Sequence, residues 1–114
     1  MARAALNHPN ADAAQWMFVW VVEMLQDYPD EAWPVLLALI AVARDAWDLA
    51  VVGSGPLQEV LVAHGAHVID RVEKYAGQDP RFRRALWSVG PSDISESVWT
   101  RVVSARGDEP GREA

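Results

Sequence analysis

Hydrophobic and polar residues follow one another along most of the chain with the period of an α-helix. From about residue 10 to residue 104, apolar residues recur at every third or fourth position, with polar residues between them. This spacing places the apolar side chains on one face of a helix, whereas a half-buried strand requires strict alternation. We therefore expect an all-α protein without a convincing strand.

Residues that start or stop helices divide the first half of the pattern. The first expected helix begins near residue 10 and ends at Tyr28, because the residue before a proline, here Pro29, avoids the helical region. Asp30 is the expected cap of the second helix. This helix continues to Gly53 and carries Trp47 on its apolar face, although a break near residues 44–45 stays open.

The glycine-rich stretch after the second helix predicts a hinge in the fold. Gly53 and Gly55 can end a helix, and Pro56 suits the first position of the next one. Gly65 is then expected just past the end of that short helix, which runs from Pro56 to His64.

Three further helices are expected in the second half of the chain. One follows the hinge and stops at Gly77. The next begins at Asp79-Pro80, with aspartate as the cap and proline at the first position. The last begins at Asp93 and Glu96, a plausible capping pair. Six helices joined by short turns predict a compact bundle of antiparallel helical hairpins. We expect a flexible N-terminus over residues 1–9, a single helical domain over 10–104, and a disordered tail over 105–114.

The hinge and the segments after it resemble an uncharacterised bacterial family, a domain of unknown function. Its members share a Gly-Pro-Leu-Glu element, a His-Gly pair, an Ile/Val-Glu-x-x-Ala helix and an Asp-Pro-x-Phe helix start. The corresponding residues lie between positions 30 and 103: Gly55-Pro56-Leu57, His64-Gly65, Val72-Glu73-Lys74-Tyr75-Ala76 and Asp79-Pro80-Arg81-Phe82. Gln58 stands where the family usually has glutamate. The resemblance implies an all-helical fold and no particular activity.

Composition excludes several classes of function. The 114 residues suffice for one domain, and 51% of them are hydrophobic, as in ordinary folded proteins. With no cysteine, disulfides, thiolate catalysis and cysteine-ligated metals are excluded. The uncharged runs are too short to span a membrane, and the first residues lack the apolar core of a signal peptide. We expect a cytoplasmic protein with no cofactor and no membrane association.

Charge is distributed unevenly along the chain. The net charge is −6, and residues 10–59 hold eight acids and one base, whereas residues 60–106 hold five acids and seven bases. Such a polarised surface can orient a protein partner. The acidic total argues against nucleic acid as the main ligand, since phosphate binding requires a dense basic field.

The first helix offers the most specific candidate surface. At 100° per residue, Trp16 and Trp20 lie opposite the main apolar face, on the side that also carries Glu23 and Asp27. Tryptophan is costly to expose and is enriched at binding hot spots. These four residues predict a recognition surface for a basic partner or a second copy of the chain. The alternative is that the domain covers this helix on both sides and that the indoles belong to the core.

A basic group on the fifth helix is a second candidate surface. Arg83, Arg84 and Trp87, together with Arg81, could bind an anion or an acidic partner, with a guanidinium stacked on the indole. The alternative is a solvated helix face with an intramolecular cation–π contact. Because this group and the Trp16/Trp20 surface carry opposite charge, a head-to-tail or symmetric dimer is a natural corollary.

The hinge offers a candidate pocket. Its candidate residues surround the Gly55-Pro56 turn: Gly55, Pro56, Leu57, Gln58, His64, Gly65 and Glu73. His64 is expected to point inward and to bond free helix carbonyls, a structural role, since no acid shares its face. A metal site at His64 and His67 is not expected, because His67 faces away. The sequence thus favours a non-enzymatic interaction domain or homo-oligomer, and a small enzyme or small-molecule binder at this pocket is the alternative.

Overall fold

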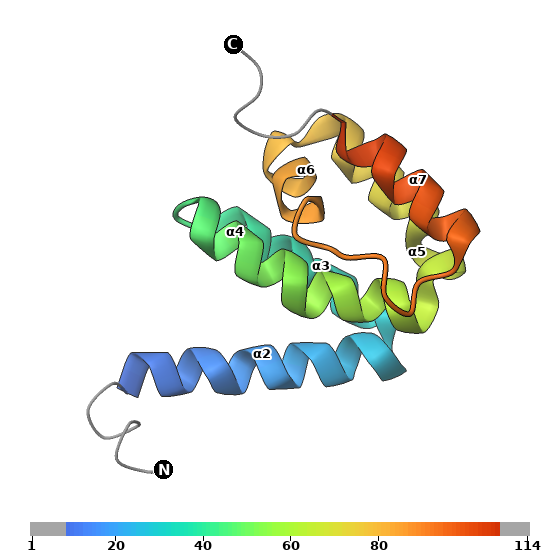
Figure 1. Ribbon diagram of the computed structural model, residues 1–114. Helices are drawn as coiled ribbons and strands as arrows, with labels where there is room; N and C mark the ends of the chain where they lie inside the picture. The colour runs from blue at the N-terminus through green and yellow to red at the C-terminus, as the bar shows by residue number, and fades with distance from the viewer. Residues whose placement is uncertain (1–8, 108–114) are drawn as a thin grey trace.

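The chain folds into helices throughout the part that the structure describes. The computed structural model describes the backbone of residues 9–107 and the side chains of Trp16 and of residues 18–107. Within these residues there is no strand, which confirms the all-α prediction (Figure 1). Residues 1–8 of the expected flexible N-terminus and residues 108–114 of the expected tail lie outside the described part. Residues 105 and 106, expected in the tail, belong to the last helix.

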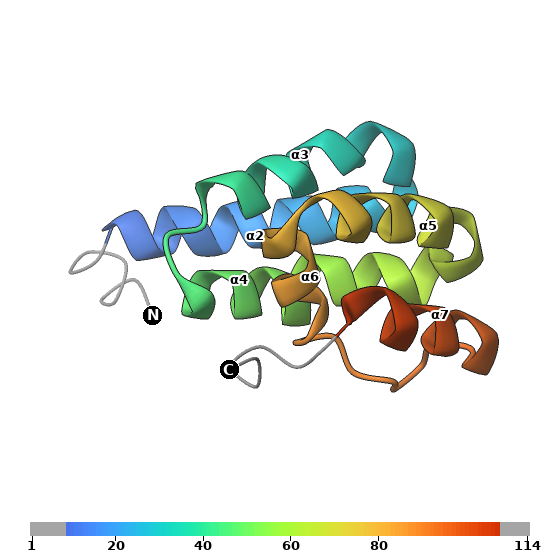
Figure 2. The same ribbon diagram turned by 90° about the horizontal axis from the view of Figure 1, so that it is seen from above.

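The helices follow one another with short connections. Their bounds are α2 (Pro9–Asp27), α3 (Pro29–Val42), α4 (Ala46–Val52), the π-helical segment η1 (Gly53–Leu57), α5 (Gln58–Gln78), α6 (Pro80–Leu86) and α7 (Glu96–Arg106). Since α4, η1 and α5 are continuous, the described residues form five separate helical segments rather than six. α2 and α3 form an antiparallel hairpin, and α2 lies at the opposite side of the molecule from α7 (Figures 1 and 2).

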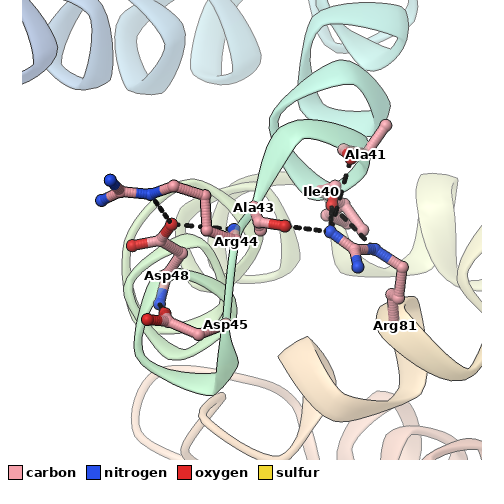
Figure 3. Close-up of polar contacts among 7 residues, drawn as sticks. All are labelled: Ile40, Ala41, Ala43, Arg44, Asp45, Asp48 and Arg81. Carbon is pink, nitrogen blue, oxygen red and sulfur yellow. Dashed lines mark hydrogen bonds and ion pairs between the residues drawn. The ribbon is translucent and has the colours of Figure 1, made fainter.

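The segment that was expected to form the second helix contains two helices instead. Asp30 is not its cap, because Pro29 already occupies the first turn and Tyr28 is the N-cap. α3 then ends at Val42. Asp45 is extended and its carboxylate accepts the backbone N–H of Asp48 at 3.0 Å, which starts α4 (Figure 3). Aspartate offers the backbone this alternative to a continuous helix, and the break follows from it.

Gly53 does not end a helix. Its φ of −66° and ψ of −46° are helical, and the chain passes through η1 into α5 without a stop. A Cβ built on Gly53 would lie 2.0 Å from the carbonyl oxygen of Ala85. The glycine is therefore required for the close approach of α6, and the prediction of a helix end at this position was wrong.

The chain does change direction at His64. This residue has φ −139° and ψ 34°, which is outside the helical region, and α5 bends sharply there before running back (Figure 2). Gly65 directly follows this bend, which separates two helical runs within α5, so the expected helix end at His64 is present, although no connection follows it. A Cβ on Gly65 would lie 3.1 Å from the side chain of Val98. Its lack of a side chain lets α7 pack against the bend.

The second half of the molecule begins its helices with short polar side chains. Asp79 caps α6 by accepting the N–H of Arg81 at 2.9 Å, as predicted, with Pro80 at the first position. α5 continues one residue past Gly77, the expected stop. The expected Asp93–Glu96 capping pair was wrong, because Ser95 caps α7 and Asp93 lies in the connection with a φ of 64°.

A single apolar core lies between the helices. Every described helix contributes to it, and its largest fully buried side chain is Phe82 of α6. The Phe82 ring contacts Trp33 of α3 and Tyr75 of α5, with ring centroids about 6 Å apart. This core holds the inner face of α2 in place and leaves its outer face to solvent.

Candidate functional site

The outer face of α2 carries large apolar side chains in solvent. Trp16 is 70% exposed, Trp20 is 47% exposed and Val19, between them, is 51% exposed. On the opposite side of the same helix, Val21 and Leu25 are fully buried. Both indoles are thus exposed rather than core, as the helical periodicity indicates. We call Trp16, Val19, Trp20, Glu23 and Asp27 the α2 outer face.

The polar members of the α2 outer face are acidic and have no charged partner within residues 9–107. Glu23 and Asp27 are exposed, and neither makes an ion pair with another described residue. The last turn of α2 contains no basic residue. A carboxylate near the C-terminus of a helix is unfavourable, because that end already carries partial negative charge. The surface is therefore an apolar patch next to carboxylates that no described residue neutralises.

Most residues of the second candidate surface make contacts within the molecule. Arg83 donates to the carbonyl of Ala76 at 2.7 Å, near the end of α5. The indole of Trp87 is half-buried and donates to the carbonyl of Arg106 at 3.2 Å. The guanidinium of Arg106 lies 3.9 Å from the centre of the Trp87 ring, so the cation–π contact exists but with a different arginine than expected. Of the three candidates, Arg84 is the one whose side chain is exposed and makes no hydrogen bond to a described residue.

The pocket candidates contact separate parts of the fold. Gln58 donates to the carbonyl of Gly90 at 3.1 Å and accepts the Gly90 N–H at 2.7 Å, which fastens the connection before α7. His64 Nε2 lies 2.5 Å from the carbonyl oxygen of Gln26, near the end of α2. Pro56 and Leu57 are buried, and a Cβ on Gly55 would be 3.9 Å from the ring of Phe18. These contacts hold helices together.

Glu73 also has a structural partner. Arg101 of α7 donates to both of its carboxylate oxygens, at 2.6 and 2.8 Å, and to Asp70 at 2.7 Å. Hydrogen bonds from Arg101 lower the pKa of Glu73, and the two carboxylates raise the pKa of Arg101. Gln58, His64 and Glu73 share no hydrogen-bond partner among the described residues. The structure therefore does not assemble them into one acid–base group.

The histidines next to the bend do not converge on one point. His67 Nε2 lies 2.9 Å from a carboxylate oxygen of Asp30, which also accepts from Arg71. These two donors lower the pKa of Asp30. Within the described residues no group of three His, Asp or Glu side chains is placed to hold a metal ion. No helix in the same part of the chain is both long and apolar enough for a transmembrane span.

Two residues near the break between α3 and α4 were misjudged from sequence. Trp47 was expected on an apolar face, yet it is 74% exposed, because the break after Val42 changes the phase of the helix. Arg81 was grouped with the anion-binding candidates, yet it donates to the carbonyls of Ile40, Ala41 and Ala43 at the end of α3 (Figure 3). The Asp45-x-x-Asp48 spacing was the available signal for the break.

Comparison with known proteins places the chain in a family without assigning it an activity. A family model described as "Family of unknown function (DUF6869)" matches residues 4–109. No curated protein and no solved structure matches the chain significantly. Because the family model covers nearly the whole chain, including every described helix, the protein belongs to the family of unknown function DUF6869.

Proposed function

We propose that the protein is a binding module that recognises another protein through the α2 outer face. The observation that carries this proposal is the exposure of Trp16 and Trp20 on a helix whose other side is fully buried. Indole side chains supply large contact areas and dominate the energetics of many interfaces. An exposed apolar group beside charged residues is typical of an interaction site.

A separate protein suits this surface better than a second copy of the chain. The head-to-tail dimer expected from the sequence requires the basic group of α6, but Arg83 and Trp87 bond within the molecule. A symmetric dimer through α2 would bring two acidic faces together in a protein with a net charge of −6. The acidic face also argues against nucleic acid as the ligand.

The family pattern consists of residues whose contacts favour a role in the fold rather than in binding. Its elements are Gly-Pro-Leu, His-Gly and Asp-Pro-x-Phe. Leu57 and Phe82 are fully buried, Asp79 caps α6, and His64 lies at the bend and contacts α2. We propose that this pattern preserves the helix arrangement and that recognition is carried by α2. The alternative of a small-molecule pocket is less well supported, because the hydrogen bonds of Gln58, His64 and Glu73 within the described residues go to three separate parts of the fold.

Capture followed by reconstitution tests the proposed function. The protein is immobilised, a captured protein is identified, and that protein is purified and its affinity is measured by calorimetry. The Trp16→Ala/Trp20→Ala variant is expected to weaken the affinity by at least about tenfold, as truncation of hot-spot residues does.

Trp47→Ala is the matched control, because it removes from α4 an indole that is at least as exposed as Trp16 and Trp20. It is expected to leave the affinity unchanged. Equal binding of the wild type and the Trp16→Ala/Trp20→Ala variant would contradict the assignment of the site to α2.

A further inference from the structure

Four of the exposed residues of α2 lie in a narrow stripe along the helix. Trp16, Trp20, Glu23 and Asp27 are separated by four, three and four residues, so they fall on one side of a regular helix. This spacing is that of the seam along which two helices pack. From Trp16 to Asp27 the stripe is about 16 Å long, or three turns.

The two halves of the stripe carry different kinds of side chain. Its N-terminal half presents the two exposed indoles and its C-terminal half presents the two carboxylates, Glu23 and Asp27. Some carboxylates in the described part have basic partners, such as Asp30 with Arg71 and Glu73 with Arg101, and others, such as Glu31, do not. Since neither stripe carboxylate has such a partner within residues 9–107, a bound cation would neutralise it and relieve the unfavourable charge at the end of α2.

We propose that the partner presents an amphipathic helix of about three turns, with apolar residues opposite Trp16 and Trp20 and lysine or arginine opposite Glu23 and Asp27. The inference rests on the proposed function and specifies the chemistry of the partner. An added β-strand does not fit, because the described residues contain no strand and hence no sheet edge to extend. A helix packs along another helix at the observed spacing, and basic residues complement the acidic half.

Designed peptides test this inference on the full chain. The Lys peptide, of about 18 residues, repeats leucine and lysine with helical spacing. The Glu peptide replaces each lysine by glutamate, and the Pro peptide carries a central proline that prevents a continuous helix. Binding is followed by calorimetry at low and at high salt. We expect the Lys peptide to bind the wild type, and the Glu and Pro peptides to bind at least about tenfold more weakly.

A charge exchange separates a specific contact from general attraction to an acidic protein. Glu23→Lys is expected to weaken the affinity for the Lys peptide about tenfold and to strengthen the affinity for the Glu peptide. Glu96→Lys changes the net charge equally at an exposed position of α7, a helix on the opposite side of the molecule from α2 (Figure 1). It is expected to change both affinities by less than about twofold. Circular dichroism of each variant establishes that the helices are retained.

The outcomes distinguish the inference from the proposed function. The inference is overturned if the Lys peptide does not bind the wild type, if Glu96→Lys acts like Glu23→Lys, or if the Pro peptide binds as well as the Lys peptide. Light scattering that shows dimers formed through Trp16 and Trp20 would assign the stripe to a second copy instead. The Trp16→Ala/Trp20→Ala variant could lose the captured partner while Glu23→Lys leaves the affinities for the Lys and Glu peptides unchanged. That result would support the proposed function and reject the inference of a basic helix.

Discussion

At the scale of single residues, the absence of a side chain determines how closely two helices of this protein approach. Gly53 lies against the backbone of α6, where a Cβ would be 2.0 Å from the carbonyl oxygen of Ala85. Gly65 lies against Val98 of α7 at a less severe 3.1 Å. The first contact involves backbone on the far side and has no flexible atom that can move away. It is therefore the more stringent of the two.

Gly53→Ala is expected to reduce the free energy of unfolding by about 3 kcal/mol or more, because η1 and α6 must separate to admit the methyl group. Urea denaturation followed by circular dichroism measures this loss. Gly77→Ala is the matched control: it is exposed within α5, and nothing lies within 4 Å of its Cβ. It is expected to raise the stability by about 0.5–1 kcal/mol. A Gly53→Ala protein as stable as the wild type would contradict the close approach.

The sequence predicted some of these residue positions and missed others for a physical reason. Helical periodicity alone placed Trp16 and Trp20 opposite the core, because Val21 and Leu25 set the phase within the same helix. It could not explain Gly53, since the atom that excludes a side chain there belongs to Ala85, far along the chain. A glycine required by a turn and a glycine required by packing have the same appearance in a sequence.

At the scale of the helices, the C-terminal ends are closed by side chains from other elements. His64 contacts a carbonyl near the end of α2, Arg81 those at the end of α3, Arg83 one near the end of α5, and Trp87 the last carbonyl of α7. The last carbonyls of a helix have no partner within the helix, so each contact satisfies an acceptor and fixes the angle between two elements. Of the arginines proposed to bind a ligand, Arg81 and Arg83 contact the fold in this way and Arg84 does not.

Arg81→Met is expected to destabilise the protein by about 1–2 kcal/mol, because three carbonyls at the end of α3 lose a charged donor while the aliphatic part of the side chain is preserved. Arg84→Met on the same helix removes an exposed arginine that makes no hydrogen bond to a described residue, and its expected effect is within about 0.5 kcal/mol. Thermal unfolding compares the two variants. Equal losses would show that α6 requires its positive charge in general rather than this contact.

Local and distant helix signals differ in how well they can be read from a sequence. The start of α6 was predicted, because Asp79 caps an N–H only two residues away. The caps of α2 and α3 were not, because His64 is 38 residues from Gln26 and Arg81 is 41 residues from Ile40. The bend at His64 was anticipated as a helix end through Gly65, whereas the continuity through η1 was not. Nothing in the local sequence distinguishes a glycine that stops a helix from one that a helix contains.

At the scale of the whole molecule, exposed ion pairs join helices that are distant in sequence. Asp30 connects α3 to Arg71 and His67 of α5, and Arg101 connects α7 to Glu73 and Asp70 of α5. These pairs are solvent-exposed, so each contributes little at neutral pH and less at high salt. They affect stability mainly when the pH is lowered and their carboxylates become protonated.

Acidification is expected to weaken the fold through these carboxylates. The pKa values of Asp30, Asp48 and Glu73 are lowered in the folded protein, by donors from Arg71 and His67, from Arg44, and from Arg101 respectively. At low pH the unfolded chain then binds more protons, so the stabilisation is present above the unfolded values and is lost as the pH falls through the folded ones. Urea midpoints measured from about pH 6 down to about pH 3 are expected to decrease.

Glu73→Gln is expected to show a shallower acid-dependent decrease, because its amide no longer titrates. Glu31→Gln, an exposed position without an ion pair in the described part, serves as the control and is expected to follow the wild type. Identical acid profiles for Glu73→Gln and the wild type would show that the Arg101 pair does not contribute.

The closure of helix ends from a distance has a consequence for synthesis of the chain. A nascent chain leaves the ribosome from its N-terminus, so the α2–α3 hairpin emerges with open carbonyl ends and an uncovered apolar side. The α2 end stays open until His64 follows, and the α3 end stays open until Arg81 follows. Arg106, which meets Trp87, comes later still. The side chains that close these helix ends therefore become available only after most of the described chain has been synthesised.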